Sequence, residues 1–301
     1  MAAEHKIVHV EGRELKLSNL DKVLWPDGKI TKAEVIKYYA EVGPYMIPFI
    51  RDRPIMAVRY PNGIQGDSFV QKHFTGLPRW VRRPDAKSTK MRDFILCNDL
   101  STLVWLANLA ALEINQMLAR SPHLTKHDIV LIDLDPHFPA TFEDARNIAR
   151  GLADLLQRLQ LDFLVKTSGA EGIHFFVPIE PRYSVEKIRR FVAAIGKLVE
   201  KAAPKLATVS PHARKKVGRV YVDFLQNSLE RTITAPFSIR ARAGAPVSFP
   251  VTMRELNDPK LNPGMFTVRT ATKQIRAARR SLYLSELSQD LKPALLKLGL
   301  K

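Results

Sequence analysis

The sequence predicts an α+β protein whose middle third folds as a ferredoxin-like sheet, and three features predict it. Residues 128–226 read as strand, helix, strand, strand, helix, strand, which is the βαββαβ order of that fold. Both helices open on a capping residue and carry apolar side chains on one face. The strands are short apolar runs bounded by Pro, Gly and Ser, as expected for a sheet that two helices cover.

The first four elements of this unit follow from local patterns. The run DIVLIDLDP (128–136) ends in Pro and predicts a buried strand. Thr141 and Asp144 form a capping pair for the helix TFEDARNIARGLADLLQRL. The strand 161–167 then meets the strand 173–179 through SGAEG, a turn sequence that predicts a hairpin.

The last elements of the unit, and two helices before it, are predicted in the same way. Ser184 opens an amphipathic helix, and a basic loop (211–218) leads into the strand 219–226. In the N-terminal third, Thr31 and Glu34 form a capping box that opens the helix TKAEVIKYYAEV. Regular leucine spacing predicts a further helix that starts at Asp99 and continues to residue 119.

Length and composition indicate one large domain or two packed modules. The chain has 301 residues, of which 46% are hydrophobic and one is a cysteine. This excludes intrinsic disorder and an internal disulfide. No apolar stretch reaches the ~18 residues of a transmembrane helix, and the first residues lack a secretory h-region. We therefore expect a soluble, cytosolic protein.

The charge of the chain indicates an anionic partner. Lys and Arg number 47 against 30 Asp and Glu, for a net charge of +17. Such an excess is typical of proteins that bind nucleic acid. A membrane surface is the alternative, but it would require one basic amphipathic helix, whereas the charges here are spread along the chain.

Strand alternation gathers acidic side chains on the sheet face opposite the helices. In this fold the first strand pairs with both the third and the fourth. If the apolar positions of 128–136 face the helices, Asp133 and Asp135 lie on the open face. The same alternation brings Asp223 of the fourth strand and His174 of the third strand to that face. An Asp-x-Asp pair alone also occurs at solvated strand ends, but an Asp inside the apolar fourth strand favours a shared site.

Three clustered carboxylates predict a metal site. They repel one another unless a cation lies among them, and hard divalent cations prefer oxygen ligands. Two such ions ~3.5–4 Å apart can hold the attacking and leaving oxygens of a phosphoryl transfer. The pattern therefore predicts metal-dependent chemistry on a nucleoside triphosphate or a phosphodiester.

Small and basic residues near these carboxylates predict an anion site. The turn 166–169 (KTSG) offers backbone N–H groups and a hydroxyl to phosphate oxygens. Arg240 and Arg242 lie two residues apart and would form a fork for a triphosphate on an extended chain, with Lys216 nearby. The alternatives are solvated arginines and, for His174, a core histidine bonded to backbone.

Six segments, in order along the chain, resemble a known family. They are SNLDKVLWPDGKITKAEVIKYY, RDRPIMAVRYPNG, DSFVQKH, LIDLDP, KTSGAEGIHFFVPI and VYVDFLQNSLERTITAPFSIRARAGAPVSFP, within residues 15–255. They resemble the polymerase domain of bacterial and archaeal DNA ligase D, the end-joining branch of the archaeo-eukaryotic primase superfamily. The resemblance implies a primase-like α+β fold, in which a ferredoxin/RRM-like catalytic sheet packs with an N-terminal α/β module.

The resemblance also implies a division of the chain. Residues 1–301 would form a single polymerase domain, made of an N-terminal DNA-end-binding module (1–127), a catalytic module (128–255) and a C-terminal extension (256–301). The sequence lacks the ligase and nuclease domains of ligase D, so we expect a stand-alone polymerase.

Site residues are implied where the motifs match. The catalytic, metal-binding aspartates of the family match Asp133, Asp135 and Asp223. The Ser and His of its second motif, which bind the incoming nucleotide, match Ser168 and His174. The other nucleotide contacts implied are Lys216, Gln226, Arg240, Arg242 and Asn115.

A DNA-end site is implied as well. Two family lysines that bind the 5′-phosphate at a break match Lys22 and Lys32. Lys32 begins the helix capped by Thr31, and a helix N-terminus favours anions; the alternative is a solvated helix-start residue. The other DNA contacts implied are Arg59, Phe69 and Lys72.

Three positions depart from the family pattern. Val70 stands where the family commonly has a second aromatic residue, which thins the stacking platform. Glu171 replaces a Lys, which removes one triphosphate contact. Asn115 replaces a His; it can donate a hydrogen bond but cannot titrate near neutral pH.

The predicted function is a template-directed nucleotidyltransferase that fills gaps and extends ends in non-homologous end joining, with a preference for ribonucleotides. The predicted cofactors are two divalent ions, Mn²⁺ or Mg²⁺. The predicted partners are DNA with 5′-phosphorylated ends or short gaps, NTP or dNTP, Ku and a separate ATP-dependent DNA ligase, but no membrane. We expect a cytoplasmic, nucleoid-associated protein. The alternatives are a non-catalytic RRM-like nucleic-acid-binding module and a two-metal nuclease.

Overall fold

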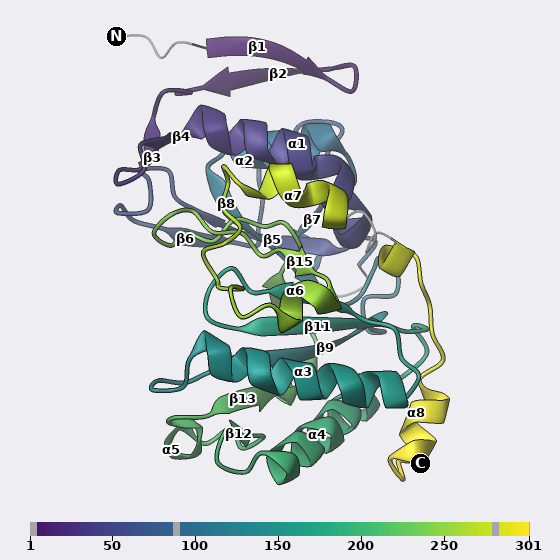
Figure 1. Cartoon of the computed structure of the whole chain (residues 1–301). Helices are drawn as coiled ribbons and strands as arrows, with labels where there is room; N and C mark the ends of the chain where they lie inside the picture. Colours follow the sequence, from purple (N-terminus) through teal and green to yellow (C-terminus); the bar gives the residue numbers. More distant parts are fainter. Residues whose placement is uncertain (1–4, 87–90, 279–282, 301) are drawn as a thin grey trace.

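The computed structural model describes residues 5–86, 91–278 and 283–300, and two packed sheets organise it (Figure 1). The upper sheet belongs mainly to the N-terminal part of the chain. The hairpin of β1 (His5–Val10) and β2 (Arg13–Ser18) lies above it. The lower sheet carries the predicted catalytic strands.

The upper sheet has the strand order β14-β8-β5-β6, and β7 also pairs with β5. Helices α1 and α2 pack against each other on top of it. The elements of this part are β3 (Val23–Trp25), β4 (Ile30–Thr31), α1 (Lys32–Ile50), β5 (Pro54–Arg59), β6 (Phe69–Gln71), β7 (Ile95–Leu96), α2 (Leu100–Asn108), β8 (Ala111–Met117) and β14 (Thr232–Thr234). Because β14 returns from beyond the catalytic strands, the two parts share a sheet as well as one hydrophobic core.

Helix α1 begins where the capping box predicts. The Thr31 hydroxyl accepts the N–H of Glu34 at 3.3 Å, and the Glu34 carboxylate accepts the N–H of Thr31 at 3.0 Å. The helix continues past the predicted segment, through Pro44 and Pro48. Each proline removes a helix hydrogen bond. The side chains between them, including the fully buried Met46, pack into the core and offset that loss.

The predicted helix 99–119 is wrong in its second half. Asp99 does cap α2, since it accepts the N–H of Thr102 at 2.8 Å. The helix ends at Asn108, and Ala110 adopts a left-handed φ of 55° before the chain enters β8. β8 is a central strand buried on both faces, so its sequence lacks the alternation that would have distinguished it from a helix.

The lower sheet confirms the ferredoxin-like order. Its strands run β12-β13-β9-β11-β10-β15, so β9 pairs with both β11 and β13, and β10 and β11 form the predicted hairpin. Helices α3 and α4 cover one face. The elements are β9 (Ile129–Pro136), α3 (Phe142–Arg158), β10 (Leu164–Thr167), β11 (Ile173–Pro178), α4 (Val185–Ala202), β12 (Ala207–Thr208), α5 (Ala213–Lys216), β13 (Val220–Asp223), the 3-10 turn η2 (Phe224–Asn227) and β15 (Pro250–Val251). The predicted strand 219–226 is therefore too long, because the chain turns into η2 after Asp223.

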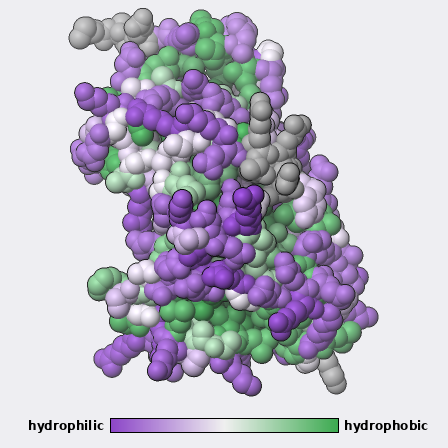
Figure 2. Space-filling model, in the orientation of Figure 1, coloured by the Kyte–Doolittle hydropathy of each residue, from purple (hydrophilic) through white to green (hydrophobic). Residues whose placement is uncertain are grey.

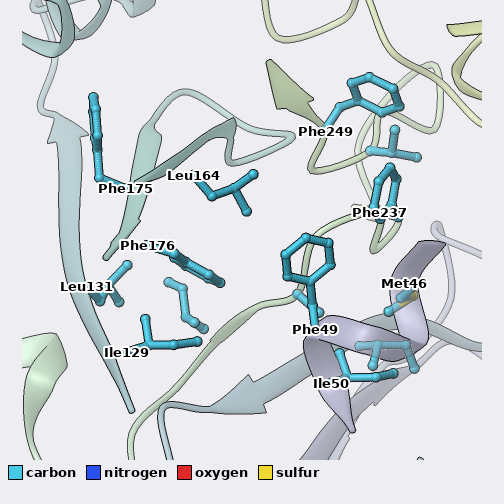
Figure 3. Close-up of a cluster of buried hydrophobic side chains, with 14 of the residues drawn as sticks. Met46, Phe49, Ile50, Ile129, Leu131, Leu164, Phe175, Phe176, Phe237 and Phe249 are labelled. Atoms are coloured by element: carbon cyan, nitrogen blue, oxygen red, sulfur yellow. The ribbon is translucent and has the colours of Figure 1, made fainter. Parts of the chain in front are cut away.

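The face opposite α3 and α4 is not open along its whole length. Ile129 and Leu131 of β9 and Phe176 of β11 point toward Phe49 and Ile50 of α1 (Figure 3). All five side chains are at most 6% exposed. The same alternation that brings aspartates to this face at one end of β9 brings apolar residues there at the other end. The apolar end packs on the N-terminal part, so only the polar end is left beside solvent.

The C-terminal part contributes α6 (Met253–Asn257), α7 (Ala271–Ala278) and α8 (Lys292–Lys297) to the outside of the molecule. Hydrophilic side chains cover the middle of the face seen in Figure 2, and hydrophobic ones gather between α3 and α4. Within the described residues, no helix combines the length and the apolar character needed to span a bilayer.

Two helix glycines provide a test of this packing. A Cβ on Gly43 of α1 would lie 2.4 Å from Leu100 Cδ1 of α2, whereas a Cβ on Gly151 of α3 would meet no atom within 4 Å. We expect Gly43→Ala to lower the free energy of unfolding by up to about 1 kcal/mol, because the end of the Leu100 side chain must move to admit the new methyl group. Gly151→Ala should raise it by about 0.5–1 kcal/mol, because alanine favours the helix. Urea denaturation of both variants measures the difference. Equal effects of the two substitutions would contradict the close approach of α1 and α2.

Candidate active site

The polar end of the lower sheet opens into a cleft of about 290 Å³ between the two sheets. Carboxylates, arginines and small residues from both parts of the chain line it. The lining residues are Asn115, Asp133, Asp135, Ser168, Ala170, Glu171, Gly172, His174, Gln226, Thr232, Ile233, Thr234, Arg240 and Arg242. Most residues predicted to bind metal or nucleotide therefore meet in one place.

The three predicted aspartates lie on neighbouring strands. Asp133 of β9 and Asp223 of β13 are direct cross-strand partners, which places their Cβ atoms about 4.5–5.5 Å apart. Burial of Asp133, together with the charges of Asp135 and Asp223, raises the pKa of its carboxyl to about 7. Burial also raises the pKa of Asp135. The fold thus holds acidic groups close together although burial and mutual repulsion destabilise their charged forms. A bound cation would relieve this repulsion.

Each aspartate has a local partner. Asp133 Oδ1 lies 3.4 Å from His174 Nε2, and Asp135 Oδ2 lies 3.3 Å from His137 Nε2. Asp223 Oδ1 accepts a backbone N–H of η2 at 2.8 Å. In the part of the chain that the structure describes, no three His, Cys, Asp or Glu side chains converge closely enough to coordinate one ion as they stand. The donor chemistry still fits a hard divalent cation, because all three side chains offer carboxylate oxygens.

A buried lysine supports His174 from beneath the cleft. Lys166 is 0% exposed; its Nζ lies 2.8 Å from His174 Nδ1 and donates to Ser248 Oγ at 2.5 Å. When the Lys166 ammonium donates to Nδ1, the Nε2–H of His174 faces Asp133. Burial lowers the pKa of both Lys166 and His174. Lys166 was predicted to lie in a phosphate-binding turn, and that prediction is wrong because β10 carries its side chain into the interior.

The turn itself begins at Ser168. Ser168 Oγ accepts the N–H groups of Ala170 at 3.1 Å and Gly172 at 3.0 Å, so its own proton is available to a ligand in the cleft. Gly169 has a φ of 71°, and a Cβ there would lie 2.7 Å from Arg240 Cγ. The turn and Arg240 are therefore packed directly against each other.

Arg240 is held in place by a chain of polar contacts. Its Nε lies 3.3 Å from the carboxylate of Glu113 on β8, and its Nη1 donates to the hydroxyl of Thr234 on β14. The Thr234 hydroxyl donates to the amide oxygen of Asn115 at 3.1 Å. Asn115 is 6% exposed, and its amide lines the cleft. These contacts fix one guanidinium beside the aspartates.

Arg242 has an exposed side chain at the mouth of the same cleft. The extended fork that the sequence suggested is wrong in detail, since the Arg242 N–H turns back to the carbonyl of Arg240 at 2.8 Å. The Arg242 carbonyl accepts the indole N–H of the buried Trp25 at 2.8 Å. A residue of β3 therefore positions the loop that carries the second arginine.

Of the remaining predicted nucleotide contacts, Gln226 lines the cleft from η2. Lys216 lies beside the cleft, with its Nζ 3.8 Å from the centre of the Tyr221 ring. The Lys216 charge nevertheless opposes the rise that burial causes in the pKa of Asp135. Glu171 stands at the position where the resemblance implied a lysine, and its negative charge adds to the rise in the pKa of Asp135.

The predicted lysine pair forms a second cluster, on the N-terminal part. The N–H of Lys32 donates to the carbonyl of Lys22 at 2.8 Å, and Lys22 Nζ donates to Asn62 at 2.8 Å. Lys32 is 5% exposed, and its Nζ donates to the Ser18 carbonyl at 2.6 Å. Burial, Lys22 and Arg59 together lower the pKa of Lys32 to about 8. Positive charges this close are stabilised by an anion.

The N-terminal N–H groups of α1 do not provide the anion site that the sequence suggested. The N–H groups of its first three residues donate to Lys22 O, Leu20 O and Thr31 Oγ1. The capping box and the preceding loop have already used these donors. Any anion here must be held by the side chains of the lysine pair.

The other predicted DNA residues lie on β5, β6 and the chain that follows. Arg59 and Phe69 are cross-strand partners, and the Arg59 guanidinium lies 5.1 Å from the centre of the Phe69 ring. Phe69 is 45% exposed and Val70 is 56% exposed. Lys72 is exposed as well. One ring that is stacked on a cation and open to solvent is a suitable platform for a base.

Comparison with known proteins identifies the family. Residues 31–282 match the family described as LigD, primase-polymerase domain. This chain belongs to that family. The resemblance and the primase-like fold predicted from the sequence are thereby confirmed, as is the assignment to a nucleotidyltransferase polymerase domain.

Named relatives agree with this assignment. The bifunctional non-homologous end joining protein LigD of Bacillus subtilis is 31% identical over 87% of this chain and 43% of its own length. The multifunctional protein of the same name from Mycolicibacterium smegmatis is 31% identical over 82% of this chain and 33% of its own length. The chain therefore spans less than half of these relatives.

A solved structure covers almost the same extent of chain. The polymerase domain from Mycobacterium tuberculosis ligase D, in complex with DNA, superposes with a TM-score of 0.83 at 29% sequence identity. The match covers 91% of this chain and 99% of that one.

Sequence reasoning missed several residues that support the cleft. Glu113 anchors Arg240, Trp25 anchors the Arg242 loop, and Ser248 completes the contacts of Lys166. A glutamate within the apolar run of β8 was a signal for a buried partner. The contact made by Trp25 joins residues 217 positions apart, and no local pattern could have revealed it.

The raised pKa of Asp133 gives a stability prediction. Its ordinary value is 3.8 and its folded value about 7, so the folded protein without metal takes up a proton between these pH values, and its stability falls as pH rises through that window. Asp133→Asn should therefore raise the Tm of the metal-free protein at pH 8 by a few degrees, and less at pH 5. Thermal denaturation at both pH values measures this, with Asp154→Asn on the exposed side of α3 as the control. If Asp133→Asn is no more stable than the parent at pH 8, the raised pKa of Asp133 is contradicted.

Proposed function

We propose that this chain is a template-directed nucleotidyltransferase that adds nucleotides to a primer 3′ end at DNA gaps and breaks. One observation carries the proposal: Asp133, Asp135, a histidine and two arginines line one cleft in a member of a primase-polymerase family, and Asp223 is the cross-strand partner of Asp133. The non-catalytic module predicted as an alternative would present bare carboxylates to a phosphate backbone. A nuclease would have no use for a paired-arginine triphosphate site.

In the proposed reaction the primer 3′-oxygen attacks the α-phosphorus of the incoming nucleotide. A new P–O bond forms to the primer, and the bond to pyrophosphate breaks. Arg240 and Arg242 bind the triphosphate, because guanidinium groups pair well with phosphate oxygens. The Ser168 hydroxyl donates a hydrogen bond to a phosphate oxygen. The side-chain amide of Asn115 lines the same cleft.

Divalent ions complete this site. We propose that Asp133, Asp135 and Asp223 hold two of them, Mn²⁺ or Mg²⁺. When bound, the ions neutralise the aspartates and the charge that develops on the reacting phosphate. Glu113 and Thr234 hold Arg240 beside the aspartates. Lys166 keeps the His174 Nε2–H directed to the carboxylates and phosphates rather than to the interior.

The DNA substrate follows from the lysine cluster. A terminal 5′-phosphate carries up to two negative charges, and it would relieve the repulsion among Lys22, Lys32 and Arg59. Relatives named for non-homologous end joining and a solved family member in complex with DNA support a role in end joining. Ku and a separate ATP-dependent ligase as partners, a preference for ribonucleotides, a cytoplasmic location near the nucleoid and the division at residues 127 and 255 stay predictions.

The direct test of the proposed function is primer extension on a one-nucleotide gap with a 5′-phosphorylated downstream strand. We expect metal-dependent addition by the parent chain with Mn²⁺ or Mg²⁺. Asp133→Ala, Asp135→Ala and Asp223→Ala should each lower the rate at least about a hundredfold, since each removes an ion ligand. Arg150→Ala on the exposed side of α3 is the control. Normal extension by a folded aspartate variant would rule out the assigned metal site, and degradation of the primer would indicate the nuclease instead.

The two arginines should act on nucleotide rather than on DNA. Arg242→Ala should raise the KM for nucleotide about tenfold to a hundredfold, as expected for a charged hydrogen bond. Arg240→Ala should do so at least as strongly, because it also removes the cation that faces Glu113 and leaves that carboxylate only the N–H of Ala241. Steady-state kinetics and DNA-binding titrations separate the two effects. A loss of DNA affinity with unchanged KM would show that these residues hold the DNA backbone.

We expect Lys22 and Lys32 to bind the 5′-phosphate of the downstream strand. The parent should bind a 5′-phosphorylated gap about tenfold to a hundredfold more tightly than a 5′-hydroxyl gap at fixed salt. The preference should weaken above pH 8, because Lys32 then loses its proton. The double variant Lys22→Met, Lys32→Met should lose the preference but retain primer extension, whereas Lys37→Met, an exposed lysine of α1, should change neither. Undiminished discrimination by the double variant would place the phosphate site elsewhere.

A further inference from the structure

Two loops at one edge of the lower sheet are bonded into a single unit. One joins β9 to α3, and the other joins α5 to β13. The N–H of Gly218 donates to the carbonyls of His137 at 3.0 Å and Phe138 at 3.2 Å, and the N–H of His137 donates to the Arg219 carbonyl at 3.0 Å. Gly218 has a φ of 69°, and a Cβ there would lie 3.6 Å from Pro139. We call this unit the paired loops.

The paired loops present hydrophobic side chains to solvent. Phe138 is 89% exposed, the highest value of any large hydrophobic side chain in the described residues, and Val217 is 64% exposed. Neither contributes to the core. An exposed aromatic ring beside an exposed aliphatic group is a typical contact surface rather than a structural element.

Cationic and neutral side chains adjoin these two residues in sequence, and the carboxylates nearest to Phe138 are Asp135 and Glu143 beyond the ends of its loop. The segments 136–142 and 211–222 contain no Asp or Glu, and they carry the exposed Arg214 and Lys215. A hydrophobic surface with a cationic rim fits a nucleic-acid strand, whose sugar and base faces are apolar and whose backbone is anionic. An ordinary protein partner would require no such charge.

The position of the paired loops indicates which part of the DNA substrate they would contact. Phe138 follows Asp135 by three residues, so their Cα atoms lie at most about 11 Å apart. In Figure 1, α5 and the loop before α3 project from the same side of the molecule as β3 and β4, with the catalytic strands between. If the lysine pair near β3 and β4 holds the downstream end of a gap, the primer duplex approaches from the opposite end, where the paired loops lie.

We propose that Phe138 and Val217 pack against the sugars of the upstream primer duplex, while Arg214 and Lys215 contact its phosphates. This inference rests on the proposed polymerase function. It adds a primer-side contact surface made by residues that contact neither the metal ligands nor the triphosphate site.

The test compares two DNA molecules. One is a primer–template duplex with a recessed 3′ end and no downstream strand. The other is a downstream duplex with a 5′-phosphate, a template overhang and no primer. Phe138→Ser should weaken binding to the primer–template about fivefold to fiftyfold, as expected when an apolar contact of one aromatic ring is lost. It should leave binding to the downstream duplex unchanged. Phe138→Trp should bind both as the parent does, and Leu296→Ser, an exposed residue of α8, is the control for surface hydrophobicity.

The salt dependence distinguishes the apolar contact from the ionic ones. Phe138→Ser should shift the plot of log Kd against log salt without changing its slope, since no phosphate contact is lost. Lys215→Ala should reduce the slope by about one phosphate contact. The two residues would then contribute to the same interface by different interactions.

The outcomes separate this inference from the proposed function. If the parent extends primers and Phe138→Ser binds both DNA molecules as the parent does, the contact surface is wrong and the polymerase assignment stands; the exposed ring would then serve a protein partner. Equal weakening on both DNA molecules would also overturn the primer-side assignment. If the parent neither binds nor extends a primer–template, both proposals fail.

Discussion

One face of the lower sheet is apolar at one end and acidic at the other, and the rest of the structure depends on this difference. On β9 the residues of this face run from apolar to acidic, so one end packs on α1 and the other lines the cleft. The apolar end, with Leu131 and Phe176 against Phe49, joins the two sheets into one core. That junction sets the width of the cleft and brings β8 and β14 opposite Asp133. The proposed active site is therefore the part of an interface between two sheets that apolar packing does not close.

Electrostatic strain accompanies this arrangement. Asp133 carries a raised pKa and Lys166 a lowered one, although they lie within the same small region. Interior charges of this kind reduce stability without ligand and favour the binding of ions and phosphates that compensate them. Buried contacts hold the charges in place: Glu113 fixes Arg240, and Trp25 ties the Arg242 loop to the β3–β4 hairpin, which lies between Lys22 and Lys32. The nucleotide cleft and the lysine cluster are thus parts of one connected framework.

Much of this could be predicted from the sequence, and the limits have physical causes. Caps and alternation identified the βαββαβ order and the convergence of Asp133, Asp135 and Asp223, because both patterns are local or follow from strand pairing. They failed at β8, which is buried on both faces, and at Lys166, which the predicted strand 161–167 contains but whose side chain is buried against Ser248, far along the chain. The helix N-terminus beside Lys32 was misjudged because its N–H groups bond to the preceding loop, which only the folded chain reveals.

The central claim is that the three aspartates form an ion site completed by nucleotide, and its most direct measurement is Mn²⁺ binding by electron paramagnetic resonance. Free Mn²⁺ would be titrated with the protein, with and without a nucleotide analogue that cannot react. The account predicts two bound ions per chain with the analogue present, and the loss of at least one in Asp223→Asn, while Asp154→Asn binds as the parent does. Equal Mn²⁺ uptake by the parent and Asp223→Asn would contradict the account.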